Sequence, residues 1–558
     1  MPAEPESVAD LAPEVAQRHF GLFAGLAAAF ICVLYLLLLN PYWHYTSDSA
    51  LYLTLGRNLC EGRGYVFSGI AHNKVPGGMP YLLSALLHVS HRFLWLNAVQ
   101  CLGVLTALLV LYFALRQMAD RATAVLVVLL TGILFWVHEY ATALMSEGPF
   151  FVLSNLAVLL LMLFVNSRGG RCRALLLVGL CAMWVLAFWY RVVACFWIGP
   201  FLFALVLAVR RPLWDRILSA AVVAAVIVAS FAVYWRWSPP AQKSTGQTVT
   251  TSESVPDAAY RLHPFAWEEH GPRILHIPRR FLLVLCPPWQ AAAGWLVPRV
   301  LAEALAWACF AIVVLGGYRA MRRGQAFLAG SILFVGPFLF WDTGNKATTG
   351  RYVIAIAPFV ILLFLLGMEG AGEFLGSRMR LRRGRKLLVF LGITAVLVPN
   401  LALLLGDIWV QRQRDFYAVY RGGGYAELMG IAKWLSAQEV REPVVVGDLN
   451  AWRVLTCLTE CRVVGLPEDV NPASPDFASK AADFARAHGT RYIVSFDAQQ
   501  PWPIWHIPTH LPGGAAPGRH WQLCECPAED GALRPVQTEP ACRWPTSIPE
   551  TGGKQPAR

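Results

Sequence analysis

A small set of ionisable side chains stands next to long apolar stretches, and their types fit acid–base and anion-binding chemistry. Asp48 carries a carboxylate that can accept a proton from a hydroxyl group. Lys74 comes just ahead of an expected helix start, where unpaired backbone N–H groups and a lysine can bind an oxyanion or a phosphate. Glu147, Arg191 and Arg351 lie at the edges of later apolar stretches, where ionisable groups are costly and usually face a pathway or a partner.

Each of these residues also has a plainer interpretation. Asp48 can be the N-cap of a helix, and Lys74 can extend to the membrane interface. Glu147 can form an ion pair with Arg191 that has no role in catalysis. One acid, one lysine and two arginines on the same membrane face favour a site over these separate explanations.

Two short helices are expected to position the aspartate and the lysine. Leu51, Leu55 and Leu59 recur every four residues, which predicts a short amphipathic helix at the membrane surface. A second helix is expected to begin near Pro76 or Pro80, because proline suits the first turn of a helix.

The composition is that of a membrane protein with many spans. Of 558 residues, 56% are hydrophobic and only 15% are charged, and the mean hydropathy is +0.48. Soluble globular chains carry about 25% charged residues. The net charge of +12 would suggest nucleic acid only if it gathered on one solvated face. It is spread over short loops instead, so no nucleic-acid partner is expected.

Apolar runs predict about eleven transmembrane helices, because a bilayer core of about 30 Å needs roughly 20 apolar residues in a helix. The expected spans are 20–40, 94–115, 123–138, 148–166, 174–190, 192–209, 217–235, 299–317, 325–341, 352–370 and 387–406. We therefore expect a polytopic α-helical membrane domain over 1–406, followed by a separate domain over 407–558.

Basic residues in the short loops predict the orientation. The loops of one side hold seventeen Lys and Arg residues against three on the other side, and the excess marks the cytoplasmic side. The N-terminus is then cytoplasmic, and the C-terminal domain is extracytoplasmic, which in a bacterial inner membrane means periplasmic. The first outer loop (41–93) and the middle outer loop (236–298) lie on that same outer side.

The tail predicts a small α/β domain with a Pro-rich extension. Its expected strands are 443–447, 462–466 and 491–496, and its expected helices are 424–438, 448–458 and 475–488. Five cysteines lie in the tail, where one or two structural disulfides are favoured over a metal site. No cofactor or required metal is expected, although His72 and Glu147 supply ligand types that a divalent cation could use.

The order of these motifs resembles the integral-membrane glycosyltransferases of the GT-C superfamily, which include protein O-mannosyltransferases, the aminoarabinose transferase of lipid A and many bacterial relatives. The resemblance extends over nearly the whole chain. It implies Asp48 as the catalytic base and Lys74, Arg351 and Arg191 as cations that bind the donor phosphate. Further site candidates are Arg57, His72, Asn73 and Glu147.

The resemblance also implies the reaction. The donor is a polyprenyl-phosphate-linked sugar, and a lipid, a glycan or a protein supplies the acceptor hydroxyl. The hydroxyl displaces the lipid phosphate with inversion at the anomeric carbon, outside the cytoplasm. Several relatives have two adjacent acids, Asp-Glu, where this chain has Asp48-Ser49.

Two other functions fit parts of the sequence. A transporter or flippase of lipid-linked molecules would need charges along a path through the bilayer, whereas here the charges gather at the outer face. A non-catalytic membrane protein with a binding tail would lose its function on deletion of the tail and tolerate substitution of Asp48 and Lys74.

Overall fold

The computed structural model describes most of the chain in separate stretches. These are residues 18–44, 46–67, 70–72, 75–167, 169–207, 212–237, 277–285, 299–334, 354–379, 384–413, 416–419, 424–440, 443–446, 449–459, 461, 463–465, 477–487, 489–496, 521–525 and 534–536. Three residues of the expected site, Asn73, Lys74 and Arg351, lie outside them, as does most of the middle outer loop.

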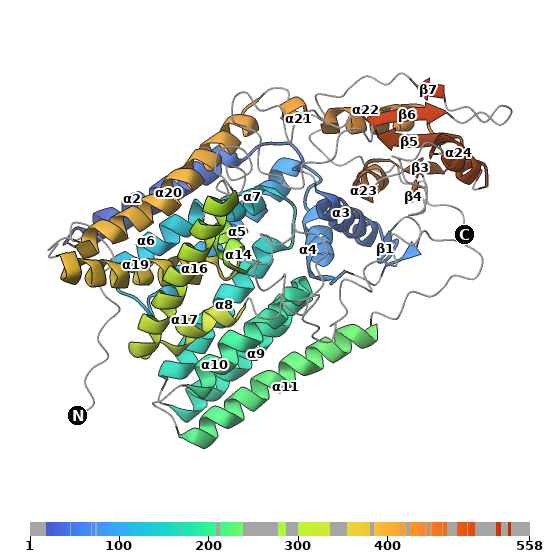
Figure 1. The fold of residues 1–558 in the computed structure, drawn as a ribbon. Coiled ribbons are helices and arrows are strands. Elements are labelled where there is room, and N and C mark those ends of the chain that lie inside the picture. Colours follow the sequence, from blue (N-terminus) through green and yellow to red (C-terminus); the bar gives the residue numbers. More distant parts are fainter. Residues whose placement is uncertain are drawn as a thin grey trace.

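Within these stretches, eight helices are long and apolar enough to cross a membrane, and each matches an expected span. They are α2 (Phe20–Leu38), α5 (Phe93–Leu115), α8 (Glu147–Asn166), α9 (Gly170–Tyr190), α11 (Leu213–Trp237), α16 (Arg299–Arg322), α19 (Ala357–Met379) and α20 (Gly384–Gln411). They form the bundle that occupies the left and lower parts of Figure 1. Large apolar side chains such as Leu22 and Leu175 point out of this bundle, as lipid-facing residues do. The protein is therefore a multi-pass membrane protein.

The other three expected spans take different forms. The run 123–138 is a bent pair, α6 (Arg121–Gly132) and α7 (Phe135–Thr142), whose axes differ by 60°. The run 192–209 is shorter than predicted, with a 3₁₀ turn (Val192–Trp197) continued by α10 (Ile198–Val206). The run 325–341 begins as α17 (Ala326–Gly330), and its second half lies outside the described residues. Including the bent pair, up to nine spans are described.

Helices α16 and α19 cross at two glycines, Gly316 of α16 and Gly367 of α19. A Cβ on Gly316 would lie 1.8 Å from the carbonyl oxygen of Leu363, so only glycine allows this approach. At the ends of these helices the buried Glu369 accepts hydrogen bonds from Arg319 and Arg323, each at 3.2 Å. These arginines belong to the set that is expected on the cytoplasmic side.

The first outer loop folds into two packed helices and a hairpin. Helix α3 (Ser47–Cys60) confirms the predicted amphipathic helix, and α4 (Gly78–Leu87) starts between the two prolines that were expected to mark it. Strands β1 (Val66–Phe67) and β2 (Ile70–Ala71) pair antiparallel between the helices. A Cβ on Gly56 of α3 would lie 2.8 Å from the Leu83 Cβ of α4, so the two helices are in close contact.

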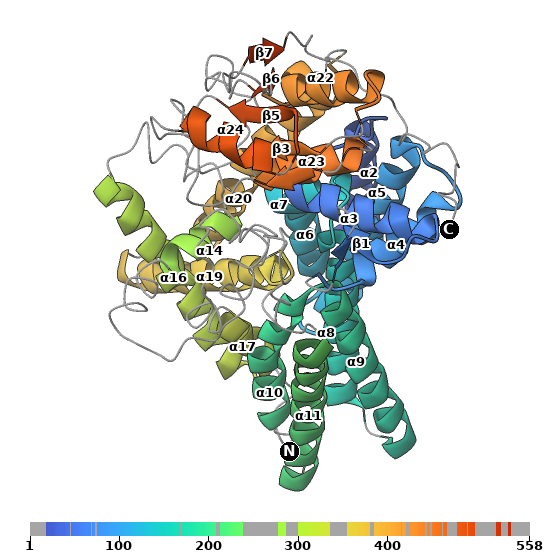
Figure 2. The ribbon, with the colours of Figure 1, turned by 90° about the vertical axis from the view of Figure 1, so that its right-hand side faces the viewer.

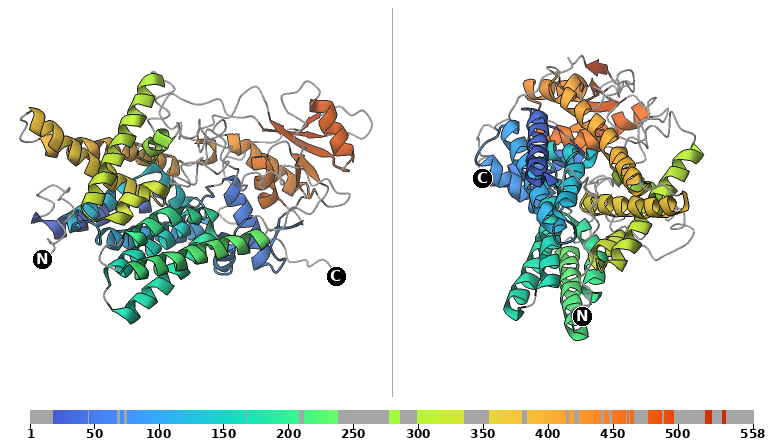
Figure 3. Two further views of the ribbon diagram at one scale, coloured as in Figure 1. Left: turned by 60° about the horizontal axis from the view of Figure 1, so that its bottom comes forward. Right: turned by 90° about the vertical axis from the view of Figure 1, so that its left-hand side faces the viewer.

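The C-terminal domain is the predicted α/β unit. Helices α22 (Gly424–Ala437), α23 (Leu449–Leu458) and α24 (Phe477–Ala487) accompany strands β3 (Val444–Val446), β4 (Val463–Gly465) and β5 (Tyr492–Phe496). Strands β6 (Trp521–Glu525) and β7 (Arg534–Val536) extend the sheet, whose order is β4-β3-β5-β6-β7. The first three strands are parallel and the last two join antiparallel. The domain lies at one end of the bundle, above α3 (Figures 2 and 3).

The structure describes the side chains of two of the five tail cysteines, so the expectation of one or two structural disulfides stays a prediction. Cys457 is a free thiol. The Cys461 thiol donates to the carbonyl oxygen of Val440 at 2.9 Å, and burial raises the pKa of the Cys457 thiol. The structure does not describe the side chains of the other three tail cysteines, Cys524, Cys526 and Cys542.

Polar contacts fasten the start of the first outer loop to the end of the last span. Asn40 donates to Gln411 at the end of α20, and the His44 ring lies 3.1 Å from the Asn40 side-chain oxygen. The Tyr417 hydroxyl of α21 (Phe416–Val419) bonds both the backbone N–H and the carbonyl of Trp43, at 3.1 and 3.2 Å. These hydrogen bonds therefore hold the chain in place just before α3 begins.

Candidate active site

The start of α3 is capped by two residues other than Asp48. The backbone N–H of Ser49 donates to Thr46 Oγ1 at 3.0 Å, and the backbone N–H of Thr46 donates to Ser49 Oγ at 2.7 Å. This reciprocal capping box satisfies the helix end. Helix capping therefore does not account for Asp48, and the buried Ser49 has a structural role at the helix start.

Glu147 and Arg191 form a buried ion pair. Glu147 is the first residue of α8, and Arg191 follows the last residue of α9. The exposed fraction of the side chain is 0% for Glu147 and 7% for Arg191. Arg191 Nη1 also donates to Ser146 Oγ at 3.3 Å. The structure thus brings two of the predicted site residues together.

Helix α3 contacts the two residues that precede Glu147 in the sequence. The Thr46 hydroxyl lies 3.0 Å from the Met145 sulfur, and the Tyr52 hydroxyl lies 3.3 Å from Ser146 Oγ. Tyr52 is one helical turn after Asp48, so both side chains lie on the same side of α3. Asp48 is therefore placed on the side of α3 that faces Ser146, the residue that Arg191 also binds.

The described partner of Asp48 comes from the C-terminal domain. Arg453 Nη1 of α23 donates to Asp48 Oδ1 at 2.8 Å, across a sequence separation of 405 residues. Both side chains are partly exposed, 27% for Asp48 and 20% for Arg453. Sequence reasoning missed Arg453, because one arginine in an amphipathic tail helix has no distinguishing pattern.

Arg57 lies at the opposite end of α3 and is buried. Its Nη1 donates to the carbonyl oxygen of Cys457 at 3.2 Å, which joins α3 to α23 a second time. This contact indicates that Arg57 helps to dock the C-terminal domain on the first outer loop.

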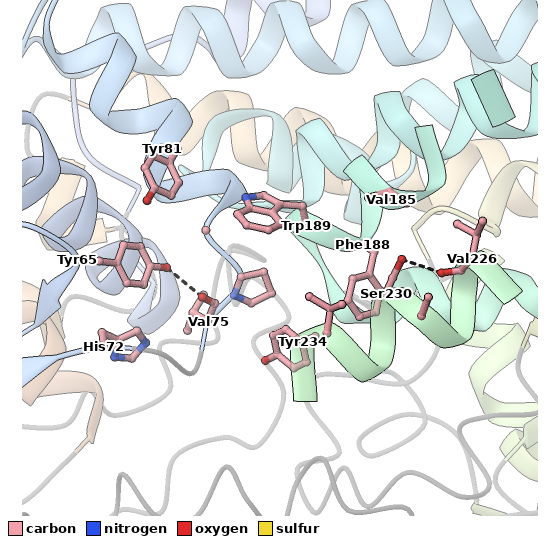
Figure 4. A pocket seen from close by; sticks show the side chains of 14 residues that line it. Tyr65, His72, Val75, Tyr81, Val185, Phe188, Trp189, Val226, Ser230 and Tyr234 are labelled. Atoms are coloured by element: carbon pink, nitrogen blue, oxygen red, sulfur yellow. Dashed lines mark hydrogen bonds between the residues drawn. The ribbon is translucent and has the colours of Figure 1, made fainter. Parts of the chain in front are cut away.

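An aromatic groove of about 630 Å³ opens between the first outer loop and the ends of α9 and α11 (Figure 4). Its aromatic and histidine side chains are Tyr65, His72, Tyr81, Phe188, Trp189 and Tyr234. Burial raises the pKa of the Tyr65 hydroxyl, which stays protonated and donates to the Val75 carbonyl at 3.0 Å. Most of the remaining lining is apolar, from valine, proline and alanine. Such a surface suits an apolar chain with a polar head at one end.

The wall of the groove next to Arg191 is closely packed. A Cβ on Gly78 at the start of α4 would lie 2.8 Å from the Tyr190 ring, and one on Gly77 would lie 3.3 Å from the Trp189 indole nitrogen. Helix α4 therefore needs glycine where it meets the end of α9. His72 and Val75, which flank Asn73 and Lys74 in the sequence, both line the groove.

The structure offers no metal centre among the residues it describes. No three His, Cys, Asp or Glu side chains come together there in a way that could hold a metal ion. The expectation of no required metal stays a prediction.

Comparison with solved structures identifies the fold. No family model and no curated protein matches the sequence. The oligosaccharyltransferase of Archaeoglobus fulgidus, tethered with an acceptor peptide, superposes with a TM-score of 0.52 at 14% identity, over 85% of this chain and 69% of that one. The same enzyme in complex with an inhibitory peptide and a dolichol-phosphate gives 0.52 at 13%, over 86% and 70%. ArnT from Cupriavidus metallidurans in the apo state gives 0.50 at 14%, over 84% and 92%. The protein therefore shares the fold of these solved structures, which agrees with the resemblance that its sequence motifs predicted.

Proposed function

We propose that the protein transfers a sugar from a polyprenyl-phosphate-linked donor to an acceptor hydroxyl at the extracytoplasmic face of the inner membrane. The observation that carries the proposal is the aromatic groove, because the loop that forms one wall of it also carries Asp48. The neighbours in fold support the same reaction, since one was solved with a dolichol-phosphate.

The proposed orientation places Asp48 and the groove outside the cytoplasm. Gln411 ends α20, and the C-terminal domain follows it there. At the opposite end of α20, which is its start, Arg385 pairs with Glu369. The excess of basic residues on the side of Arg385 supports a cytoplasmic location for that end. A lipid-linked donor suits the outer face, because its lipid stays in the membrane and presents the sugar on that side.

Asp48 is proposed to be the general base. In the reaction, the acceptor oxygen forms a bond to the anomeric carbon and its proton moves to the Asp48 carboxylate. The bond between the anomeric carbon and the phosphate oxygen breaks, and its electron pair stays on the phosphate. A positioned base of this kind contributes about 10²–10⁴-fold to the rate.

Lys74 and Arg351 are proposed to bind the leaving phosphate. His72 and Val75 on either side of Asn73-Lys74 line the groove, which supports this role for the lysine. Arg191 was expected as a third such cation, but its guanidinium is buried against Glu147, so we assign it to the support of the site near Trp189. Cations aimed at developing charge are usually the largest electrostatic contribution to such a step.

The direct test is turnover of a panel of polyprenyl-phosphate sugars by the purified protein. Release of polyprenyl monophosphate from one donor, together with transfer of its sugar to an added acceptor, is the expected result. If a well-folded preparation releases no phosphate from any donor, the enzyme proposal fails and the transporter and tail-binding functions take its place.

A groove-filling variant tests whether the lipid occupies the groove. Ala229 lines it, so Ala229→Trp is expected to raise the donor KM roughly tenfold, the effect of losing contact with about two methylene groups. Ala221 lies on an exposed part of the same helix outside the groove lining, and Ala221→Trp is the matched control. Equal KM values for both variants would place the donor elsewhere.

A further inference from the structure

The partner that the structure gives Asp48 belongs to a different domain. Helix α23 lies across α3 (Figures 1 and 2), and Arg453 bonds the Asp48 carboxylate at 2.8 Å. The Asp48 side chain remains 27% exposed beside this bond, so a substrate can still reach it. The base of the proposed reaction is thus held from outside the membrane domain.

The docking of α23 on α3 has other support. Arg57, 6% exposed, donates to the Cys457 carbonyl, and Thr54 hydrogen-bonds to the Cys457 thiol. Val454 and Leu455 are fully buried on the same helix. An ion pair as exposed as Asp48–Arg453 adds little to such an interface. Buried contacts that dock the domain therefore lie apart from the partly exposed bond between Arg453 and the Asp48 carboxylate.

We propose that Arg453 is a positioning residue. It holds the Asp48 carboxylate in the orientation in which it takes the proton from the acceptor hydroxyl. This rests on the proposed function of Asp48 as the base. The C-terminal domain then completes the catalytic site, rather than serving only as a binding module. Because a misplacement of about 1 Å can cost roughly a hundredfold in rate, we expect loss of the Arg453–Asp48 bond to slow the chemical step.

The test compares Arg453→Gln with Arg486→Gln. Arg486 lies in the same domain and also bonds an aspartate, Asp483, at 2.5 Å, but it does so on the surface of α24. For Arg453→Gln we expect kcat to fall roughly ten- to hundredfold, with the donor KM within about twofold of wild type. Arg453→Lys should recover part of the loss, and Arg486→Gln should match wild type.

Labelling of the Cys457 thiol shows whether the domain stays docked. Cys457 is buried against α3, so a thiol reagent reaches it only when α23 moves away. The labelling rate, followed by mass spectrometry, is expected to be the same in wild type and Arg453→Gln. Faster labelling in the variant would show that Arg453 docks the domain and would overturn the positioning role.

The kinetic outcomes are equally decisive. An unchanged kcat in Arg453→Gln, or a rise in donor KM alone, contradicts positioning. If wild type turns over a donor and Asp48→Asn does not, while Arg453→Gln remains fully active, then this inference fails and the proposed function stands. No turnover by wild type contradicts both.

Discussion

Two acid–arginine pairs lie at the end of the bundle that carries the first outer loop, and they differ in burial. Glu147 and Arg191 are enclosed between α8 and the end of α9, with exposed fractions of 0% and 7%. Asp48 and Arg453 join α3 to α23 and are 27% and 20% exposed. The Tyr52 and Ser146 hydroxyls connect the two regions.

The difference in burial indicates that the Glu147–Arg191 pair supports the fold and that the Asp48 carboxylate is available to react. A buried pair has lost its hydration, so removal of one partner leaves an uncompensated charge in a dry environment. A partly exposed pair keeps contact with water and contributes about 0–1 kcal/mol. We infer that the buried pair holds the segment against which α3 starts, while the exposed pair stays within reach of substrate.

The largest expected effect on stability comes from breaking the buried pair. Glu147→Gln removes the charge that compensates Arg191, and the free energy of unfolding should fall by about 3–5 kcal/mol. Equilibrium unfolding in mixed detergent micelles measures this loss. A change below about 1 kcal/mol would contradict the structural role of the pair.

Replacing both members sharpens the same comparison. The double variant Glu147→Gln with Arg191→Gln leaves no isolated charge, so it should be more stable than Glu147→Gln alone by about 1–3 kcal/mol. The same unfolding measurement on wild type, both single variants and the double variant gives the coupling energy. Additive losses would show that the two residues act independently.

The exposed pair should have the smallest effect on stability. Asp48→Asn and Arg453→Gln are each expected to change the free energy of unfolding by less than about 1 kcal/mol. Losses comparable to that of Glu147→Gln would mean that this pair also supports the fold, and the contrast between the two regions would disappear.

Much of the fold was predictable because its signals are local. Leu51, Leu55 and Leu59 predicted α3, and long apolar runs predicted the eight continuous spans. In the tail, the alternation of short apolar strands with amphipathic helices gave β3, β4 and β5 to within two residues. The bend between α6 and α7 was missed, because an apolar run of normal length does not show where the helix breaks.

The site was predictable only in part, because its contacts are distant in sequence. Glu147 and Arg191 were proposed as a possible pair, and the structure joins them. Arg453 was missed, since its contact with Asp48 depends on how the tail docks. The roles of Thr46 and Ser49 at the helix start were also missed, because Asp48 was an equally suitable cap by residue type.

The central claim is that Asp48 acts as a base while the buried pair supports it. Single-turnover release of polyprenyl phosphate by wild type, Asp48→Asn and the control Asp483→Asn tests this most directly, since Asp483 is an exposed aspartate that also pairs with an arginine. We predict a loss of about 10²–10⁴-fold for Asp48→Asn and wild-type rates for Asp483→Asn. Wild-type release by a folded Asp48→Asn protein would contradict the account.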